Sequence, residues 1–240
     1  EIADYSNNYK LGTSIIKSTS KFFYGVAFTN AASANPTDAM TRSDTYKDDV
    51  IDPLKLQSKT FYLGEKGDEI ADYSNNYKLG TTIIKSTSKF FYGALEVDAA
   101  SANPTDAMTR SDTYKDDVIT ASKLQSKTYY VGDKGDEIAD YSNNYKLGTT
   151  IIKSTSKFFY GALEVDAASA NPTDAMTRSD TYKDDQVIAT KLQSKTYYLG
   201  EKSDEIADYS NNYKLGTSII KSTSKFFYGV AFTNAASANP

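Results

Sequence analysis

The sequence predicts an all-β tandem-repeat protein of 68-residue units, in which antiparallel hairpins stack in a linear array. The segment EIADYSNNYKLGT begins at Glu1 and recurs at intervals of 68 residues. Short stretches within each unit alternate between two sets of side chains, as in a strand. The chain also contains 20 Tyr and 11 Phe, and aromatic residues favour strands. These three observations together predict the fold class.

The repeats divide the chain into three full copies and a half copy. The full copies span residues 1–68, 69–136 and 137–204, and the half copy spans 205–240. Each full copy consists of a first half, A, of 36 residues and a second half, B, of 32 residues. Because the chain closes with a half copy, its layout is A-B, A-B, A-B, A.

The outer A halves differ from the inner ones at one patch and at one further position, where Ser14 becomes Thr82. Residues 1–36 and 205–240 are identical at all 36 positions. Positions 26–30 read Val-Ala-Phe-Thr-Asn, whereas the inner A halves have Ala-Leu-Glu-Val-Asp there. Terminal repeats are atypical when they cap a stack, so this pattern favours an array with special ends. Drift or recombination between near-identical copies is the alternative.

Half A is expected to form a hairpin. Residues Tyr9–Ile16 alternate and end in β-branched side chains, which predicts a strand. Residues Lys21–Phe28 place aromatic side chains on both faces, which predicts a second, more buried strand. The short polar segment Lys17–Lys21 between them suits a hairpin loop.

Half B is expected to repeat this arrangement. Residues Leu54–Leu56 and Thr60–Leu63 form the second pair of predicted strands, and Gly64–Asp68 has the composition of a turn. Asn35 could cap a short helix, but poor helix formers follow it, so we expect a loop there. Both halves share Tyr-Lys, Ser-Lys, an aromatic pair and Gly in the same order, which predicts one supersecondary unit per half.

Other architectures fit the same pattern. A β-propeller or closed toroid would use the half unit as its blade. An outer-membrane β-barrel would use the alternating aromatic strands. An engineered repeat protein without a biological function would show the same near-identity of copies. A transmembrane helix is not expected, because no run approaches 18 consecutive apolar residues.

The composition argues against catalysis and against nucleic-acid binding. The chain has no His and no Cys, so it lacks an imidazole base, a thiolate nucleophile and the usual zinc ligands. We therefore expect no enzyme and no resident cofactor. Acidic residues outnumber basic ones 31 to 27, and no basic stripe or Gly-rich phosphate loop is present.

The run Asp-Tyr-Ser-Asn-Asn-Tyr is the strongest candidate binding site. Aromatic rings pack on the apolar face of a sugar, while carboxylates and amides bridge its hydroxyls. A turn leading into a strand is the competing interpretation. The candidate glycan-binding residues are Asp4, Tyr5, Asn7, Asn8, Tyr9, Asp72, Tyr73, Asn75, Asn76, Tyr77, Asp140, Tyr141, Asn143, Asn144, Tyr145, Asp208, Tyr209, Asn211, Asn212 and Tyr213.

A weaker candidate is a calcium site at the junction between the first two 68-residue repeats. Asp68, Glu69 and Asp72 place three carboxylates within five residues, and calcium prefers oxygen ligands. The spacing of an EF-hand loop is absent. A charged turn is the alternative.

These observations predict a non-catalytic structural or adhesive protein of an extracellular or cell-surface assembly. The chain is similar in kind to tandem-repeat surface proteins. Its expected partner is itself, in a stacked or head-to-tail homo-oligomer that could form filaments. Because the last A half is identical to the first, it could replace that half in the next molecule. The alternative function is a multivalent lectin with one weak glycan site per repeat.

Overall fold

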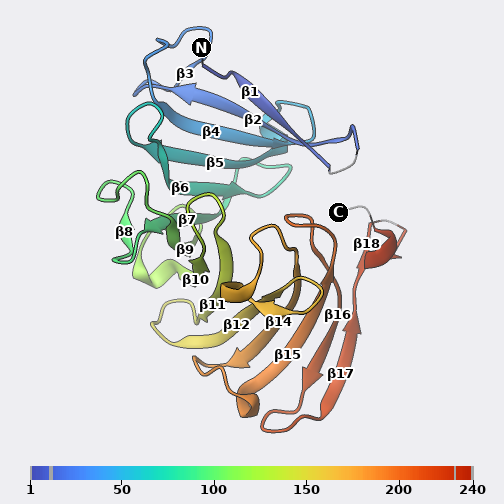
Figure 1. The fold of residues 1–240 in the computed structure, drawn as a ribbon. Helices are drawn as coiled ribbons and strands as arrows, with labels where there is room; N and C mark the ends of the chain where they lie inside the picture. The colour runs from blue at the N-terminus through green and yellow to red at the C-terminus, as the bar shows by residue number, and fades with distance from the viewer. Residues whose placement is uncertain (1, 11–12, 230, 239–240) are drawn as a thin grey trace. The chain divides into compact units, whose positions relative to one another are not determined.

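The computed structural model describes residues 2–10, 13–229 and 231–238. Within these ranges the chain has nineteen strands and five short 3-10 helices, and no α-helix. Fourteen of the strands are long and follow one another as successive hairpins, with two in each half unit (Figure 1). The predicted all-β tandem-repeat fold of antiparallel hairpins is confirmed.

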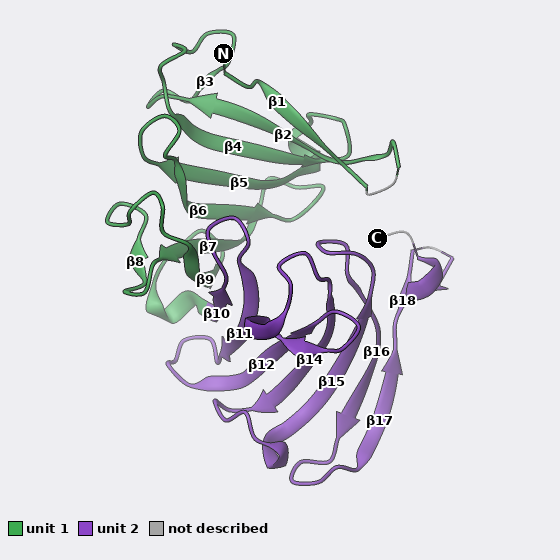
Figure 2. Cartoon of the chain, in the orientation of Figure 1, with its two compact units in different colours: residues 1–124 green, residues 125–240 purple. Residues whose placement is uncertain are grey.

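The chain divides into two compact units, residues 1–124 and 125–240 (Figure 2). The strands that lie in the first unit are β1 (Tyr5–Tyr9), β2 (Ile16–Tyr24), β3 (Thr29–Asn30), β4 (Met40–Lys47), β5 (Leu56–Leu63), β6 (Ile70–Tyr77), β7 (Ile84–Tyr92), β8 (Val97–Asp98) and β9 (Met108–Lys115). Its 3-10 helices are η1 (Pro53–Lys55) and η2 (Ala121–Lys123).

The second unit repeats this series. Its strands are β10 (Leu124–Val131), which begins at the last residue of the first unit, β11 (Ile138–Tyr145), β12 (Ile152–Tyr160), β13 (Val165–Asp166), β14 (Met176–Lys183), β15 (Leu192–Leu199), β16 (Ile206–Tyr213), β17 (Ile220–Lys225), β18 (Phe227–Tyr228) and β19 (Thr233–Asn234). Its 3-10 helices are η3 (Ala167–Ser169), η4 (Ala189–Lys191) and η5 (Ala235–Ser237).

The register of pairing is the same in every copy. In the first unit β2 pairs with β4 so that Lys21 faces Asp44, and in the second unit β12 pairs with β14 so that Lys157 faces Asp180. All the long pairs are antiparallel. In the described part of the chain β1 pairs only with β2 and β17 only with β16, so the sheet is unclosed.

The first predicted hairpin is shifted along the chain. In the second copy the turn lies at Lys78–Ile83, where Lys78 N donates to Ile83 O (2.9 Å) and Thr81 Oγ1 to Lys78 O (2.7 Å). The predicted strand Tyr9–Ile16 is therefore wrong, and its residues 11–12 lie outside the described residues. The predicted loop Lys17–Lys21 is wrong as well, because it lies inside β2.

Tertiary pairing explains that shift. The polar segment is a central strand with a partner on each side, so its backbone groups are satisfied by ladder bonds and its hydroxyls by neighbouring strands. Ser20 and Thr45 hydroxyls, for example, lie 3.1 Å apart across β2 and β4. Local polarity therefore does not mark a loop in this protein.

The second predicted strand of half A ends earlier than expected. Gly25 has a φ of +63° and its N–H donates to Ala39 O (3.0 Å), so the chain turns there. Phe28, at the end of the predicted strand, also has a positive φ of 52°. Residues 25–28 are therefore a turn rather than strand.

Half B follows the prediction only in part. The predicted strand Thr60–Leu63 lies inside β5, but Leu54–Leu56 is replaced by η1 followed by the start of β5. Within half B the partner of β5 is β4, whose polar sequence Met-Thr-Arg-Ser-Asp-Thr-Tyr-Lys has no alternating apolar pattern. Asn35 begins a loop, as expected, and its Oδ1 accepts from Thr37 N (3.1 Å).

The apolar core is small and recurs with the repeat. Ile70, Tyr92 and Ala99 form one buried cluster, and their equivalents Ile138, Tyr160 and Ala167 form another. Many of the other buried side chains are polar: Thr87 is only 1% exposed. The sheet is thus held by repeated polar contacts as much as by apolar packing, and each contact needs its neighbouring strand.

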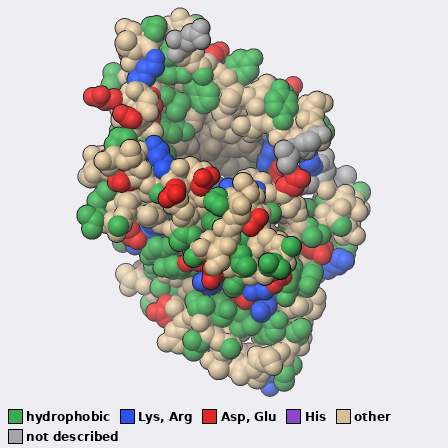
Figure 3. All heavy atoms as spheres, viewed as in Figure 1, with side chains coloured by type: hydrophobic (Ala, Val, Ile, Leu, Met, Phe, Trp, Pro, Cys, Tyr) green, Lys and Arg blue, Asp and Glu red, His purple; other side chains and the backbone are tan. Residues whose placement is uncertain are grey.

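Charge is mixed on the molecular surface. In the view of Figure 3, acidic and basic side chains are interspersed among hydrophobic and uncharged ones. None of the described residues belongs to a helix with the length and apolar character needed to cross a membrane.

Candidate functional site

All the candidate glycan residues except Asp4 lie on strands, and the interpretation of the run as a turn is wrong. In the second copy the run occupies β6, a central strand paired with β5 and β7. Side chains alternate between the faces of a strand, so Tyr73, Asn75 and Tyr77 share one face while Asn76 lies on the other. The equivalent runs occupy β1, β11 and β16, with Asp4 just before β1.

The acidic residue of the run sits at a β-bulge. Tyr73 pairs with Phe61 and Ala71 with Tyr62, which leaves Asp72 as the extra residue. Its Oδ1 lies 3.3 Å from Lys89 Nζ on β7. The carboxylate is therefore engaged by a cation of the same repeat.

The aromatic rings of the run stack on the preceding strand. Tyr73 lies 4.5 Å from Phe61, and Tyr209 lies 4.6 Å from Tyr197, measured between ring centroids. Burial raises the pKa of Tyr73 above its usual value, with Asp72 adding to the effect. One face of each ring is thus used within the sheet.

The amides of the run are also committed to neighbours. Thr87 Oγ1 donates to Asn75 Oδ1 (2.9 Å) and lies equally close to Asp116 O. Asn76 Nδ2 lies 3.4 Å from Ser86 Oγ on the opposite face. The run is therefore first of all a structural ladder.

A pocket in the third copy nevertheless brings several candidates together. Its volume is about 360 Å³, and three of its lining residues are Asp140, Tyr141 and Asn143 from β11. Thr155, Lys157, Asp185 and Val187 complete the lining. These four could not be selected from the sequence, because β12 and the loop after β14 reach the pocket only through strand pairing.

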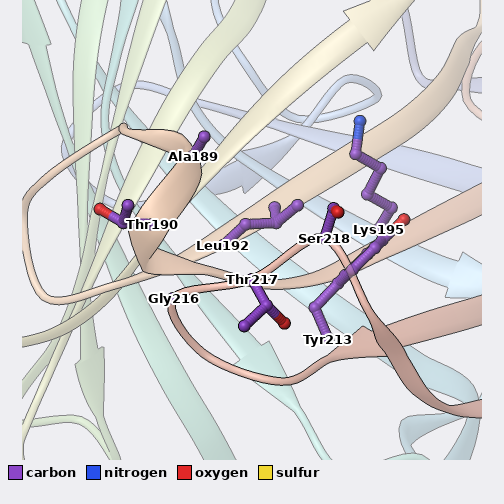
Figure 4. A pocket seen from close by; sticks show the side chains of 8 residues that line it. All are labelled: Ala189, Thr190, Leu192, Lys195, Tyr213, Gly216, Thr217 and Ser218. Atoms are coloured by element: carbon purple, nitrogen blue, oxygen red, sulfur yellow. The ribbon is translucent and has the colours of Figure 1, made fainter.

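Two further pockets each include candidates. One of about 320 Å³ is lined by Asp208, Tyr209 and Tyr197 together with Glu164. Another, of about 480 Å³, lies between η4 and the turn before β17, and Tyr213 and Lys195 are among its lining residues (Figure 4). The run therefore contributes to concave surfaces at several places in the second unit.

A buried charge cluster crosses the same face of the sheet. Asp180 lies 2.9 Å from Arg178 Nε and 3.3 Å from Lys195 Nζ. Arg178 lies over the ring of Phe159, at 4.0 Å from its centroid, and is paired with Glu164. The equivalent Asp44 contacts Arg42 and Lys59 in the first copy. Each of these cations is paired with a carboxylate of the same sheet, so the cluster stabilises the fold.

The structure does not gather the candidate calcium ligands. Glu69 accepts hydrogen bonds from Met40 N and Gly67 N (both 2.9 Å), and Asp72 faces Lys89. Asp68 lies in the exposed turn before them. Among the residues that the structure describes, no group of three or more potential ligands could hold a metal ion.

No protein-family model matches the chain, and no curated protein matches it. The function is therefore inferred from the residues and their geometry alone.

Proposed function

We propose that this chain is a non-catalytic structural tandem-repeat protein of an extracellular or cell-surface assembly, whose copies join end to end. The support is a repeated register of strand pairing that adds one hairpin after another without a change of geometry. Such a ladder extends wherever an edge strand meets its complementary strand.

The observation that carries the proposal is the exposure of β17. The six residues of this strand have the same sequence as the first six residues of β2, β7 and β12. Thr19, Thr87 and Thr155 in those strands are buried, whereas every described side chain of β17, including Thr223, is exposed. Among the described strands, β17 pairs residue by residue with β16 alone, which leaves its outer edge open. An exposed edge with a buried counterpart elsewhere in the chain favours pairing with another molecule.

A proline in this edge should prevent the assembly. Phe226 N donates to Asp208 O on β16 (2.9 Å), so the alternation of an antiparallel ladder directs the N–H of Lys225 to the open edge. Lys225→Pro removes that donor while β16 keeps its bonds. We expect the association constant to fall at least about tenfold, the equivalent of one or two edge hydrogen bonds.

Sedimentation velocity across a concentration series measures this effect, and negative-stain electron microscopy shows whether the oligomers are linear. Lys225→Ala is the matched control, because it removes the side chain but keeps the N–H. A chain that stays monomeric at every concentration, or a proline variant that assembles as well as the control, contradicts the proposal.

A second candidate function is multivalent glycan binding. It is favoured by the 360 Å³ pocket in which a tyrosine ring, a carboxylate and an amide from one run meet the exposed carboxylate of Asp185. Equivalent residues in the other copies would give several weak sites with a shared avidity.

Glycan binding is tested by retention of the intact chain on an array of immobilised oligosaccharides. Asp185→Ala should weaken the retention several-fold, because one carboxylate that bridges sugar hydroxyls is lost and avidity amplifies the loss. Glu201→Ala, which removes an exposed carboxylate that does not line that pocket, is the control. Absence of retention by the intact chain excludes this candidate.

A further inference from the structure

The patch that distinguishes outer from inner A halves contacts the arginine of the following half B. In the third copy Glu164 pairs with Arg178. In the first copy the equivalent residue is Phe28, whose ring centroid lies 5.0 Å from the Arg42 guanidinium carbon. Phe28 also meets Phe61 edge to face, at 5.9 Å between centroids. The inner half thus contacts the arginine of its repeat through an ion pair, and the outer half contacts the equivalent arginine through an aromatic ring.

The terminal A half carries the outer type of patch, and its phenylalanine side chains are exposed. Phe232 adopts the same φ of 52° as Phe28, yet it is 76% exposed and Phe28 only 39%. Phe227 is 55% exposed, whereas its equivalent Phe23 lies 3.9 Å from Arg42. All three arginines of the chain lie in the halves that precede residue 205.

The threonine hydroxyl of β17 has fewer hydrogen-bond partners among the described residues than its equivalent in β2. Thr223 Oγ1 donates to Asn211 Oδ1 (2.8 Å) on β16. Its equivalent Thr19 lies 3.0 Å from Asn7 Oδ1 and also 3.0 Å from Asp48 O of the following half B. Backbone, hydroxyl and aromatic groups of the terminal half therefore all lack the same neighbour in the described part of the chain.

We propose that the terminal A half, residues 205–240, docks on β4 and β5 of a second copy by taking the place of that copy's residues 1–36. This inference rests on the end-to-end association proposed above and names its partner surface. Because residues 205–240 and 1–36 are identical, the incoming half reproduces each contact of the outgoing half. Lys225 would face Asp44, and Phe227 would face Arg42, in the register that β2 has now.

The topology explains why the exchange is confined to the first A half. The first A half is paired with the rest of the sheet only through β4, because β1 has β2 as its sole partner among described strands. The inner half that contains β6 and β7 is paired on both sides, with β5 and with β9. An incoming half can replace the first A half by breaking only the ladder between β2 and β4. In its new position it contacts Arg42, which Phe28 contacts now.

A cysteine pair tests this geometry directly, since the chain has no Cys. Ser20 faces Thr45 with hydroxyls 3.1 Å apart, so Ser224 should face Thr45 of the second copy. Directly opposed residues have Cβ atoms about 4.5–5.5 Å apart, close enough for a disulfide or a short bismaleimide. We expect the Ser224→Cys, Thr45→Cys variant to form a ladder of covalent oligomers, with a 45–224 cross-link identified by mass spectrometry.

The matched control places the second cysteine in the next copy. Thr113 is the equivalent of Thr45 and its hydroxyl lies 3.3 Å from Ser88, but its A half cannot leave. The Ser224→Cys, Thr113→Cys variant should therefore cross-link at least about tenfold less, with Ser224→Cys alone as the background. Equal yields from the two variants, or a 45–224 link within one chain, would overturn the proposal.

Two lysine substitutions should act in opposite directions. Phe232→Lys places a cation beside the Arg42 of the second copy, so the 45–224 cross-link should fall about tenfold. Phe28→Lys weakens the contacts that the first A half makes with Arg42 and Phe61, so this half is displaced more easily and the same cross-link should increase several-fold. If oligomers form in solution but neither substitution changes the cross-link, the exchange is wrong while end-to-end association stands. If no oligomers form at all, both fail.

Discussion

The substitution Asp180→Asn should lower the free energy of unfolding by about 3 kcal/mol or more, because it removes the carboxylate charge that Arg178 and Lys195 share in a buried ion cluster. Asp180 is 3% exposed and holds both Arg178 and Lys195. Lys157, which lies directly opposite it on β12, pairs instead with Asp140. Two cations bound to one buried carboxylate explain why a neutral residue of the same shape cannot replace it.

The control for Asp180→Asn is Asp184→Asn in the turn after the same strand. Asp184 lies 3.2 Å from Lys191, but its side chain is 43% exposed. Exposed pairs contribute about 0–1 kcal/mol, and Asn tolerates the positive φ of 61° at this position. Denaturant titration followed by circular dichroism compares the two variants. An equal loss of stability in both variants would mean that the buried cluster contributes no more to the free energy of unfolding than the exposed pair.

The substitution Gly132→Ala is the second change with a large expected effect. Gly132 has a φ of +116°, and an added Cβ would lie 2.7 Å from Asp136 O. Both the backbone strain and the clash with a backbone oxygen oppose a side chain here, so we expect a loss of about 3–5 kcal/mol. Its equivalents Gly64 and Gly200 show the same close approach, at 2.5 and 2.4 Å.

The same turn contains its own control. Gly135 also has a positive φ, of +91°, but an added Cβ would meet nothing within 4 Å. The third copy has Ser203 at this position with a φ of 72°, so a side chain is accepted there. Gly135→Ser should therefore cost no more than about 1 kcal/mol. Thermal unfolding of the two variants side by side measures the difference, and similar melting temperatures would contradict the assignment of the clash.

The candidate site was predictable in composition but not in arrangement. The sequence singled out the Asp-Tyr-Ser-Asn-Asn-Tyr run because of its residue types. It did not predict that Asn76 and Tyr77 face opposite sides of a strand, or that Tyr141 shares a pocket with Lys157 and Asp185. Those partners lie on other strands, and only the register of pairing brings them near.

The sequence by itself determined the repeat, the all-β class and the identity of the two outer A halves, because these follow from periodicity and residue type. Only the tertiary structure decided which polar segments are strands. β2 and β4 carry almost no apolar alternation, and they are extended because neighbours on both sides satisfy their backbone and hydroxyl groups. The same dependence on neighbours leaves β17 exposed, since a strand of this kind is complete only when its partner is present.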